Sequence, residues 1–205
     1  MPSEAAISVQ DDHVGRIGPN AVIRVAEALR AVEGACSVDR VFRAANLAHY
    51  LISAPSAMID EDEVTRLHRA LRESVGRDRA RTVGWIAGQL TADYLLGHRI
   101  PAAAQLALRC LPSGLASRQL TTAIARNAWT FAGSGAFAAR HGRPTIFTIG
   151  NCPICRGLQS AVPCCDFYTG TFERLFARLV HASARVVETR CLAMGASDCT
   201  FAVTW

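Results

Sequence analysis

The chain has 205 residues, half of them hydrophobic, and carries a formal net charge of +5. This composition excludes a disordered chain, and no apolar run reaches the roughly 18 residues that a membrane span needs. All 22 basic residues are arginines, which are scattered apart from a denser run at Arg77, Arg79 and Arg81. This scatter indicates a solvated surface, and no recognised motif supports nucleic-acid binding. A ligand that carries carboxylates suits the planar arginine fork.

The first 18 residues are expected to form a flexible arm ahead of a single domain over residues 19–205. Residues 1–12 are polar and contain no apolar core, so we expect no signal peptide and a cytosolic setting that keeps thiols reduced. The segment from Gly15 to Pro19 has the composition of a turn, and Pro19 suits the first turn of a helix.

Residues 19–135 are expected to be mainly helical. Apolar residues recur there at helical spacing, and glycine, proline or acidic first turns mark the ends of the segments. The predicted helices cover residues 19–34, 37–52, 61–76, 77–96, 101–110 and 115–129. In the longest of them Gly84 and Gly88 lie on one face, which favours the close approach of another helix over that of a flat ligand.

Residues 136–205 change to a mixed pattern. Strand-forming residues occupy 145–149, 186–190 and 200–204, and an amphipathic helix is predicted over 168–181. The last two strands are separated by a glycine-containing segment and form a predicted hairpin. We therefore predict an α+β fold, in which a helical N-terminal part packs with an antiparallel sheet.

Six of the eight cysteines lie between residues 151 and 205. The predicted hairpin brings Glu188, Cys191 and Cys199 together, and these are donors of the kind that bind zinc. A tetrahedral site lacks one further donor, and Cys164 or Cys165 is the nearest source. Disulfides and simple packing of buried thiols are the alternatives; a reducing cytosol disfavours the first, and the local concentration of thiols disfavours the second.

Cys36 and Cys110 are isolated in apolar helical segments, where burial by packing alone is expected.

The end of the chain carries the pattern Glu, two residues, Cys, then a Gly, then Cys, any residue, Phe. This pattern resembles the end of the 4-vinyl-reductase domain, which also forms the aromatic-effector sensor of phenol-responsive bacterial activators. The resemblance implies a zinc site made of Cys165, Glu188, Cys191 and Cys199, with Cys164 as the fallback for the first of them. It also implies a fold like that of TRAPP subunits, which often dimerises, so a homodimer is expected.

Cys152 and Cys155 are additional to the sensor pattern. Their Cys-x-x-Cys spacing suits a second metal or redox chemistry, but no second such pair supports either role. We expect them to be structural or accessory thiols.

Over nearly its whole length the chain resembles members of this domain family that serve bacteriochlorophyll biosynthesis in purple photosynthetic bacteria, including residues 15–20 and 150–157. The family name implies reduction of a vinyl group on a chlorophyll precursor. However, no glycine-rich turn joins a strand to a helix, as binding of NADPH or a flavin usually requires, and a zinc ion closed by four protein ligands is a structural one. We therefore expect no catalytic residue.

The leading expectation is an accessory protein that binds and carries a magnesium-porphyrin intermediate such as magnesium-protoporphyrin. The expected partners are the magnesium chelatase and the following methyltransferase of the pathway. The alternative is an 8-vinyl reductase (position 4 in older nomenclature) that uses an external reductant, and a small-aromatic sensor is a third candidate. A cytoplasmic location is expected, or a peripheral one at the photosynthetic membrane.

A porphyrin needs a large apolar cleft with a few polar groups to orient it. The expected apolar walls are Trp85, Trp129 and Phe131, with Arg99 and Arg126 to hold the propionates. His98, with His49 and His141 as alternatives, is the candidate axial ligand of the magnesium.

Overall fold

The computed structural model describes residues 15–205, so most of the predicted arm lies outside the described residues. The chain begins with a two-residue strand and a run of helices. These elements are β1 (Arg16–Ile17), α1 (Asn20–Glu33), α2 (Ala35–Ala44), α3 (His49–Ile52), β2 (Ile59–Asp60), α4 (Glu61–Val75), α5 (Arg77–His98), α6 (Ala102–Cys110), α7 (Ser113–Arg126) and α8 (Trp129–Ala132). The C-terminal part contains β3 (Phe137–Arg140), β4 (Thr145–Gly150), α9 (Asp166–Leu179), β5 (Arg185–Arg190), a short 3₁₀ helix (Leu192–Met194) and β6 (Asp198–Thr204).

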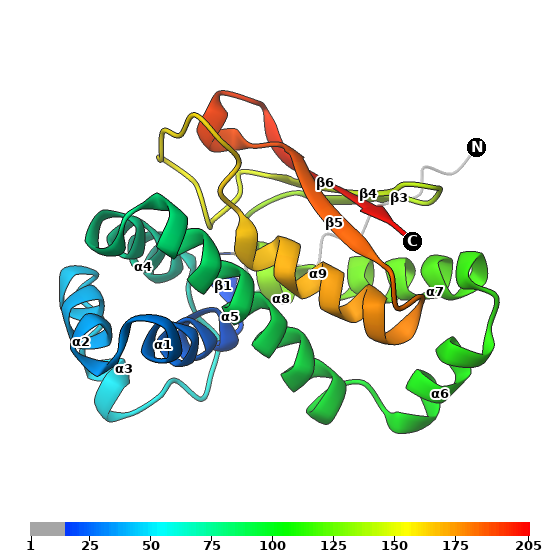
Figure 1. Cartoon of the computed structure of the whole chain (residues 1–205), viewed down its shortest axis with the longest axis horizontal. Helices are drawn as coiled ribbons and strands as arrows, with labels where there is room; N and C mark the ends of the chain where they lie inside the picture. The colour runs from blue at the N-terminus through cyan, green and yellow to red at the C-terminus, as the bar shows by residue number, and fades with distance from the viewer. Residues whose placement is uncertain (1–14) are drawn as a thin grey trace, which may run out of the picture.

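Four strands form an antiparallel sheet in the order β3-β4-β6-β5. Alternate residues of β4 and β6 are buried, among them Phe147, Ile149, Phe201 and Val203, so one face of the sheet supplies much of the core. Helix α9 lies against this face, and α5 packs beside α9 (Figure 1). Helices α1 to α4 gather at one end of this pair, and α6 and α7 lie at the other (Figure 1). The predicted α+β fold is confirmed.

Two glycines allow α5 and α9 to pack closely. A Cβ atom on Gly88 would lie 2.1 Å from the carbonyl oxygen of Phe167, and one on Gly170 would lie 2.2 Å from that of Trp85. Each glycine therefore faces the backbone of the partner helix, where a side chain has no room. The prediction that the glycine face of the long helix receives another helix is confirmed at Gly88.

Several predicted boundaries were wrong. Arg16 and Ile17, within the predicted arm, pair with Asp60 and Ile59 because Ile17 buries its side chain against the helices. The helix predicted over residues 37–52 is interrupted at Asn46, whose φ of 59° lies in the left-handed region that asparagine tolerates better than most residues.

Cys36 and Cys110 were expected to be buried, but both are exposed. Cys36 sits in the first turn of α2, and Cys110 ends α6, a helix without a buried residue. Apolar neighbours in the sequence did not show which face of these helices is turned to solvent.

Candidate functional site

Six cysteines from four segments converge at the end of the sheet where β4, β5 and the start of β6 meet. Cys152 and Cys155 lie in the turn after β4, Cys164 and Cys165 precede α9, and Cys191 and Cys199 flank the turn between β5 and β6. The strand register produces this convergence because Ile149, near the end of β4, pairs with Cys199 on β6. All six side chains are at most 5% exposed. We call these six cysteines and Glu188 the thiol cluster.

The sulfur atoms of the thiol cluster are unbonded but close together. The Sγ–Sγ distances are 3.6 Å for Cys152–Cys165, 3.4 Å for Cys155–Cys199 and 3.6 Å for Cys165–Cys199. Ligands of one tetrahedral zinc ion, each at about 2.3 Å, lie about 3.8 Å from one another. The spacing therefore fits thiolates that share a metal ion and is too long for a disulfide.

Glu188 enters the thiol cluster from β5. One carboxylate oxygen accepts a hydrogen bond of 2.7 Å from the backbone N–H of Cys165, while the other, Oε1, is buried without a hydrogen-bond partner. Burial and then the neighbouring Cys191 thiolate raise the pKa of Glu188 to about 9. A divalent cation at this point would favour the ionised carboxylate instead and would give Oε1 a partner.

The four predicted zinc ligands come together. The donor atoms of Cys165, Glu188, Cys191 and Cys199 lie within 4.8 Å of one another. The backbone N–H of Leu192 points at the Cys199 sulfur, with an N–Sγ distance of 3.4 Å, a contact that favours the thiolate. Contacts with neighbouring thiols, that with Cys155 first, lower the pKa of Cys191. The residues present therefore fit a metal ion with three thiolates and one carboxylate.

A buried ion-pair network joins α4 to the turn that carries Cys152 and Cys155. Glu61 accepts hydrogen bonds from the backbone N–H and the hydroxyl of Ser134, at 2.7 and 2.6 Å, and from Arg156 at 2.9 Å. Nearby, Arg72 donates to the carbonyl oxygen of Cys164. These contacts fix the loop backbones between which the thiols are held.

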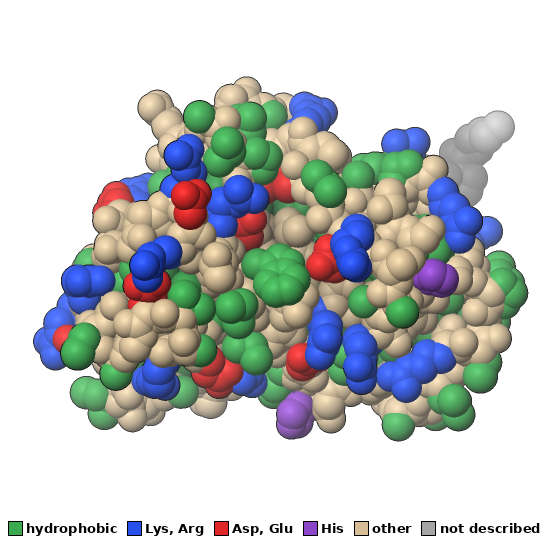
Figure 2. Space-filling model, in the orientation of Figure 1, with side chains coloured by type: hydrophobic (Ala, Val, Ile, Leu, Met, Phe, Trp, Pro, Cys, Tyr) green, Lys and Arg blue, Asp and Glu red, His purple; other side chains and the backbone are tan. Residues whose placement is uncertain are grey.

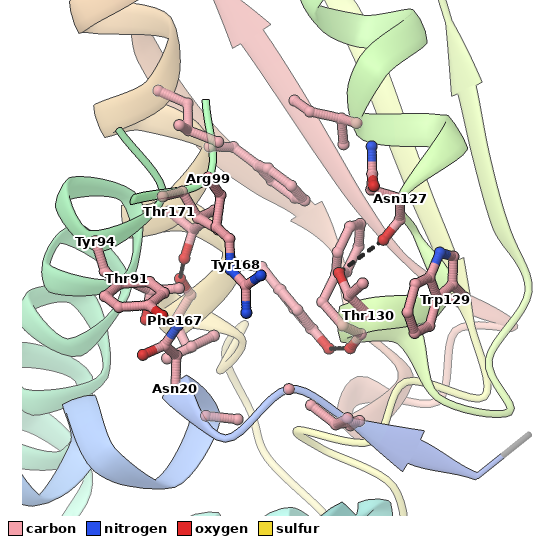
Figure 3. Close-up of a pocket in the computed structure, with 18 of the residues that line it drawn as sticks. Asn20, Thr91, Tyr94, Arg99, Asn127, Trp129, Thr130, Phe167, Tyr168 and Thr171 are labelled. Carbon is pink, nitrogen blue, oxygen red and sulfur yellow. Dashed lines mark hydrogen bonds between the residues drawn. The ribbon is translucent and has the colours of Figure 1, made fainter. Parts of the chain in front are cut away.

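A second feature is a cavity of about 460 Å³ between the helices. Its walls come from the start of α1, from α5, α7 and α8, and from one face of α9 (Figure 3). Apolar side chains such as Leu120, Phe172 and Leu175 make most of the wall. Polar groups are few, and Figure 3 shows the Arg99 guanidinium extending into the space between Tyr94 and Thr130. Arg99, Asn127 and Trp129 are exposed, so we take them to mark the mouth.

The thiol cluster and the cavity share α9. Cys165 immediately precedes this helix, and Phe167 and Tyr168 in its first turn line the cavity. Tyr168 is also fixed by a hydrogen bond of 2.7 Å from its hydroxyl to the carbonyl oxygen of Phe131. The position of the thiols therefore sets the position of part of the cavity wall.

The family model of the 4-vinyl-reductase domain matches residues 145–204, which contain the whole thiol cluster. Two curated relatives match over nearly the full chain. The bacteriochlorophyll synthase 23 kDa chain of Cereibacter sphaeroides is 42% identical over 91% of this chain and 89% of its own length. The protein of the same name from Rhodobacter capsulatus is 38% identical over 97% of this chain and 91% of its own. The chain belongs to this family. The resemblance to the 4-vinyl-reductase domain is confirmed.

Solved structures show where the same fold occurs. An H-NOX protein from K. algicida aligns with a TM-score of 0.61 and 10% identity, over 92% of this chain and 96% of that chain. A second structure, which concerns heme distortion in the H-NOX family, aligns with a TM-score of 0.58 and 13% identity over 92% and 95% of the two chains. At these identities the likeness shows the fold alone. The likeness to TRAPP subunits stays a prediction.

The structure gathers three of the six predicted ligand-contacting residues of this family member at the cavity: Arg99, Trp129 and Phe131. Trp85 lies instead at a separate shallow depression with Asp166. His98 is exposed and stacks on Tyr94, with ring centroids 4.6 Å apart.

Arg126 is exposed and is not among the residues that line the cavity. None of the candidate axial ligands His49, His98 and His141 lines it either.

The sequence reasoning missed several residues of the site. Cys152, Cys155 and Cys164 belong to the thiol cluster, and the Cys-x-x-Cys spacing was the signal that pointed to the first two. The polar cavity residues Asn20, Thr91, Asn127 and Thr171 carried no such signal, because single residues on helices show their common cavity only once the helices are packed.

Among the described residues, none of the helices combines the length and apolar character required to cross a membrane. Figure 2 shows arginine side chains distributed over the whole of one face, several beside acidic side chains, rather than gathered in a stripe. This distribution agrees with the solvated surface predicted from the sequence.

Proposed function

We propose that this protein binds and carries a magnesium-porphyrin intermediate of bacteriochlorophyll biosynthesis in the cavity between α1, α5, α7, α8 and α9. The observation that carries the proposal is the cavity itself, found in a chain whose family belongs to this pathway. Its volume of about 460 Å³ lies within the range typical of ligand sites, and its lining is mainly apolar with a few polar groups. A flat apolar macrocycle with charged edges suits such a lining.

Arg99 supplies the charge that a propionate needs. Its guanidinium extends into the cavity (Figure 3), and none of the ion pairs found among residues 15–205 involves it. An unpaired arginine beside an apolar wall binds a carboxylate through charge-assisted hydrogen bonds. Asn127 at the mouth offers a further polar side chain.

Support at the level of the fold comes from the H-NOX structures, one of which concerns heme distortion and therefore a porphyrin in that family. The helical part of the present chain encloses its cavity within the same architecture. No histidine is among the residues that line the cavity. We therefore propose that the macrocycle and its carboxylates, rather than an imidazole–magnesium bond, provide the binding free energy.

The metal of the thiol cluster has a structural role in this proposal. Zinc bound by Cys165, Glu188, Cys191 and Cys199 would have four protein ligands and no open position for a substrate. Such an ion would hold the β5–β6 hairpin to the start of α9, where Phe167 and Tyr168 line the cavity. The pigment would bind in the cavity and not at the ion.

The carrier would receive the porphyrin from the magnesium chelatase and pass it to the methyltransferase that follows. Enclosure of the macrocycle would shield it from water and other pigments during this transfer. Homodimerisation belongs to the same proposal.

Titration of the purified protein with magnesium-protoporphyrin tests the proposal. We expect a shift of the Soret band that saturates at one porphyrin per chain, and a comparable shift with metal-free protoporphyrin because no histidine lines the cavity. Failure of either tetrapyrrole to bind would refute the carrier. Turnover of a divinyl substrate with NADPH by this protein alone would instead favour the reductase.

A further inference from the structure

We propose that the thiol cluster binds two metal ions, the second held by Cys152, Cys155, Cys165 and Cys199. The donor sulfurs of these four residues lie within 4.8 Å of one another and all four side chains are fully buried. This set shares Cys165 and Cys199 with the zinc site proposed above. The two ions would therefore be bridged by two thiolates, and the inference rests on that first site.

The distances within the second set are those of ligands around one ion. Cys152 and Cys165 are 3.6 Å apart, Cys155 and Cys199 are 3.4 Å apart, and the bridging pair Cys165 and Cys199 is 3.6 Å apart, each measured between sulfurs. Tetrahedral thiolate ligands of zinc stand about 3.8 Å apart. The thiolates of an iron–sulfur cluster bind different irons and so stand farther apart, which makes two mononuclear ions the better fit.

The backbone around Cys152 is arranged as a turn that presents two sulfurs to one point. The N–H groups of Cys155 and Arg156 both donate to the carbonyl oxygen of Cys152, at 3.3 and 2.9 Å. Asn151 enters this turn with a φ of 48°, in the left-handed region. A Cys-x-x-Cys turn of this kind is the usual way in which a chain supplies two ligands to a structural zinc ion.

The pairing of the two sites accounts for most of the cluster. Five thiolates and Glu188 serve as ligands, and every donor of the first site keeps its place. Cys164 alone is left over, beside Cys191 at an Sγ–Sγ distance of 3.8 Å. Its sulfur also forms a compact group with Cys155, Cys165 and Cys191, which is the competing assignment of the second ion.

Thiophilic divalent ions with no geometric preference of their own suit an all-sulfur tetrahedral site, and zinc is the commonest of these. Two zinc ions also balance charge better than one. Six anionic ligands around two dications leave the same net charge as the four anionic ligands of the first site around one. The second ion therefore adds two ligands without adding net charge to the buried cluster.

Metal content per chain tests the proposal. Protein purified with zinc in the medium should contain two zinc ions per chain by elemental analysis and by native mass spectrometry. The Cys152→Ser/Cys155→Ser variant should retain one, while the matched control Cys36→Ser/Cys110→Ser, which changes two exposed thiols, should retain two. Cys164→Ser should also retain two, and a fall to one in this variant would overturn the assignment in favour of the competing set.

One zinc ion per chain in both wild type and Cys152→Ser/Cys155→Ser would refute the second site and leave the first intact. No zinc in the wild type would refute both. If the serine variants fail to fold, Co²⁺ titration of the metal-free wild type decides the question. We expect the thiolate-to-cobalt absorption to grow up to two equivalents, with loss of paramagnetic signal in the second half as bridged ions couple. Saturation at one equivalent would refute the proposal.

Discussion

Substitution of Gly88 by alanine tests the packing on which the cavity depends. The new Cβ atom would lie 2.1 Å from the carbonyl oxygen of Phe167, about 1.3 Å short of the 3.4 Å at which ordinary contact begins. Because the obstacle is helix backbone, α5 and α9 must separate. Overpacking of this kind costs about 3 kcal/mol, and the better helix propensity of alanine returns about 1 kcal/mol. We therefore expect a net loss of about 2 kcal/mol in the free energy of unfolding.

The matched control is Gly84→Ala, one helical turn earlier on the same face. Its Cβ atom would meet its nearest neighbour at 3.5 Å, an ordinary contact, so the propensity gain of about 0.5–1 kcal/mol should appear alone. Urea unfolding followed by circular dichroism measures both variants. The two substitutions are thus expected to shift the midpoint in opposite directions. A Gly88→Ala protein as stable as Gly84→Ala would show that the helices do not cross as described.

Three further predictions concern the site. Glu61→Ala leaves Arg156 and Ser134 without their partner and should cost about 2–3 kcal/mol in urea unfolding, against less than about 1 kcal/mol for the exposed Asp62→Ala. Burial acts to raise the pKa of Glu61, but hydrogen bonds from Ser134 and Arg156 outweigh it and lower that pKa, so the stability from the ionised carboxylate is present above pH 4.5 and is lost as the pH falls through the lowered value; an acid titration that shows equal stability profiles for wild type and Glu61→Gln would contradict this. Arg99→Gln should weaken porphyrin binding about tenfold in the Soret titration, whereas Arg126→Gln, outside the cavity, should leave it unchanged. Removal of metal by a chelator should lower the thermal midpoint and expose the six cluster thiols to a thiol reagent, and a midpoint that does not move would argue against a structural ion.

The metal ligands were the part of the site that the sequence predicted best. Glu188, Cys191 and Cys199 belong to a hairpin whose two strands and turn can be recognised locally, and a hairpin brings its ends together by its own geometry. The structure adds only a bulge between Glu188 and Arg190. The contribution of Cys152 and Cys155 depends on how β4 pairs with β6, a register between distant segments that no local pattern specifies.

The strand β3 was missed for a similar reason. Phe137 to Arg140 reads Phe-Ala-Ala-Arg, and alanine and arginine have no preference for strands. It forms because it lies at the edge of the sheet beside β4, where Phe137 packs on Phe147 with ring centroids 5.6 Å apart. A tertiary contact thus determines the local structure here.

The cavity was predicted only in outline. Arg99, Trp129 and Phe131 were proposed on residue type and do line it, but Trp85, proposed on the same basis, faces away because the α5 backbone at that point packs on Gly170. Which side of a long helix faces a cavity depends on where its partner helix crosses. That information lies in α9 and not in the sequence of α5.

The most direct test of the central claim is porphyrin titration of two tryptophan variants on α7. Ala123 lines the cavity, whereas Ala125, two residues later on the same helix, is exposed and does not. Both changes add the same large side chain, so only the cavity distinguishes them. The carrier proposal predicts that Ala123→Trp abolishes the Soret shift with magnesium-protoporphyrin while Ala125→Trp retains it at wild-type affinity. Equal binding by the two variants would place the pigment elsewhere and contradict the account.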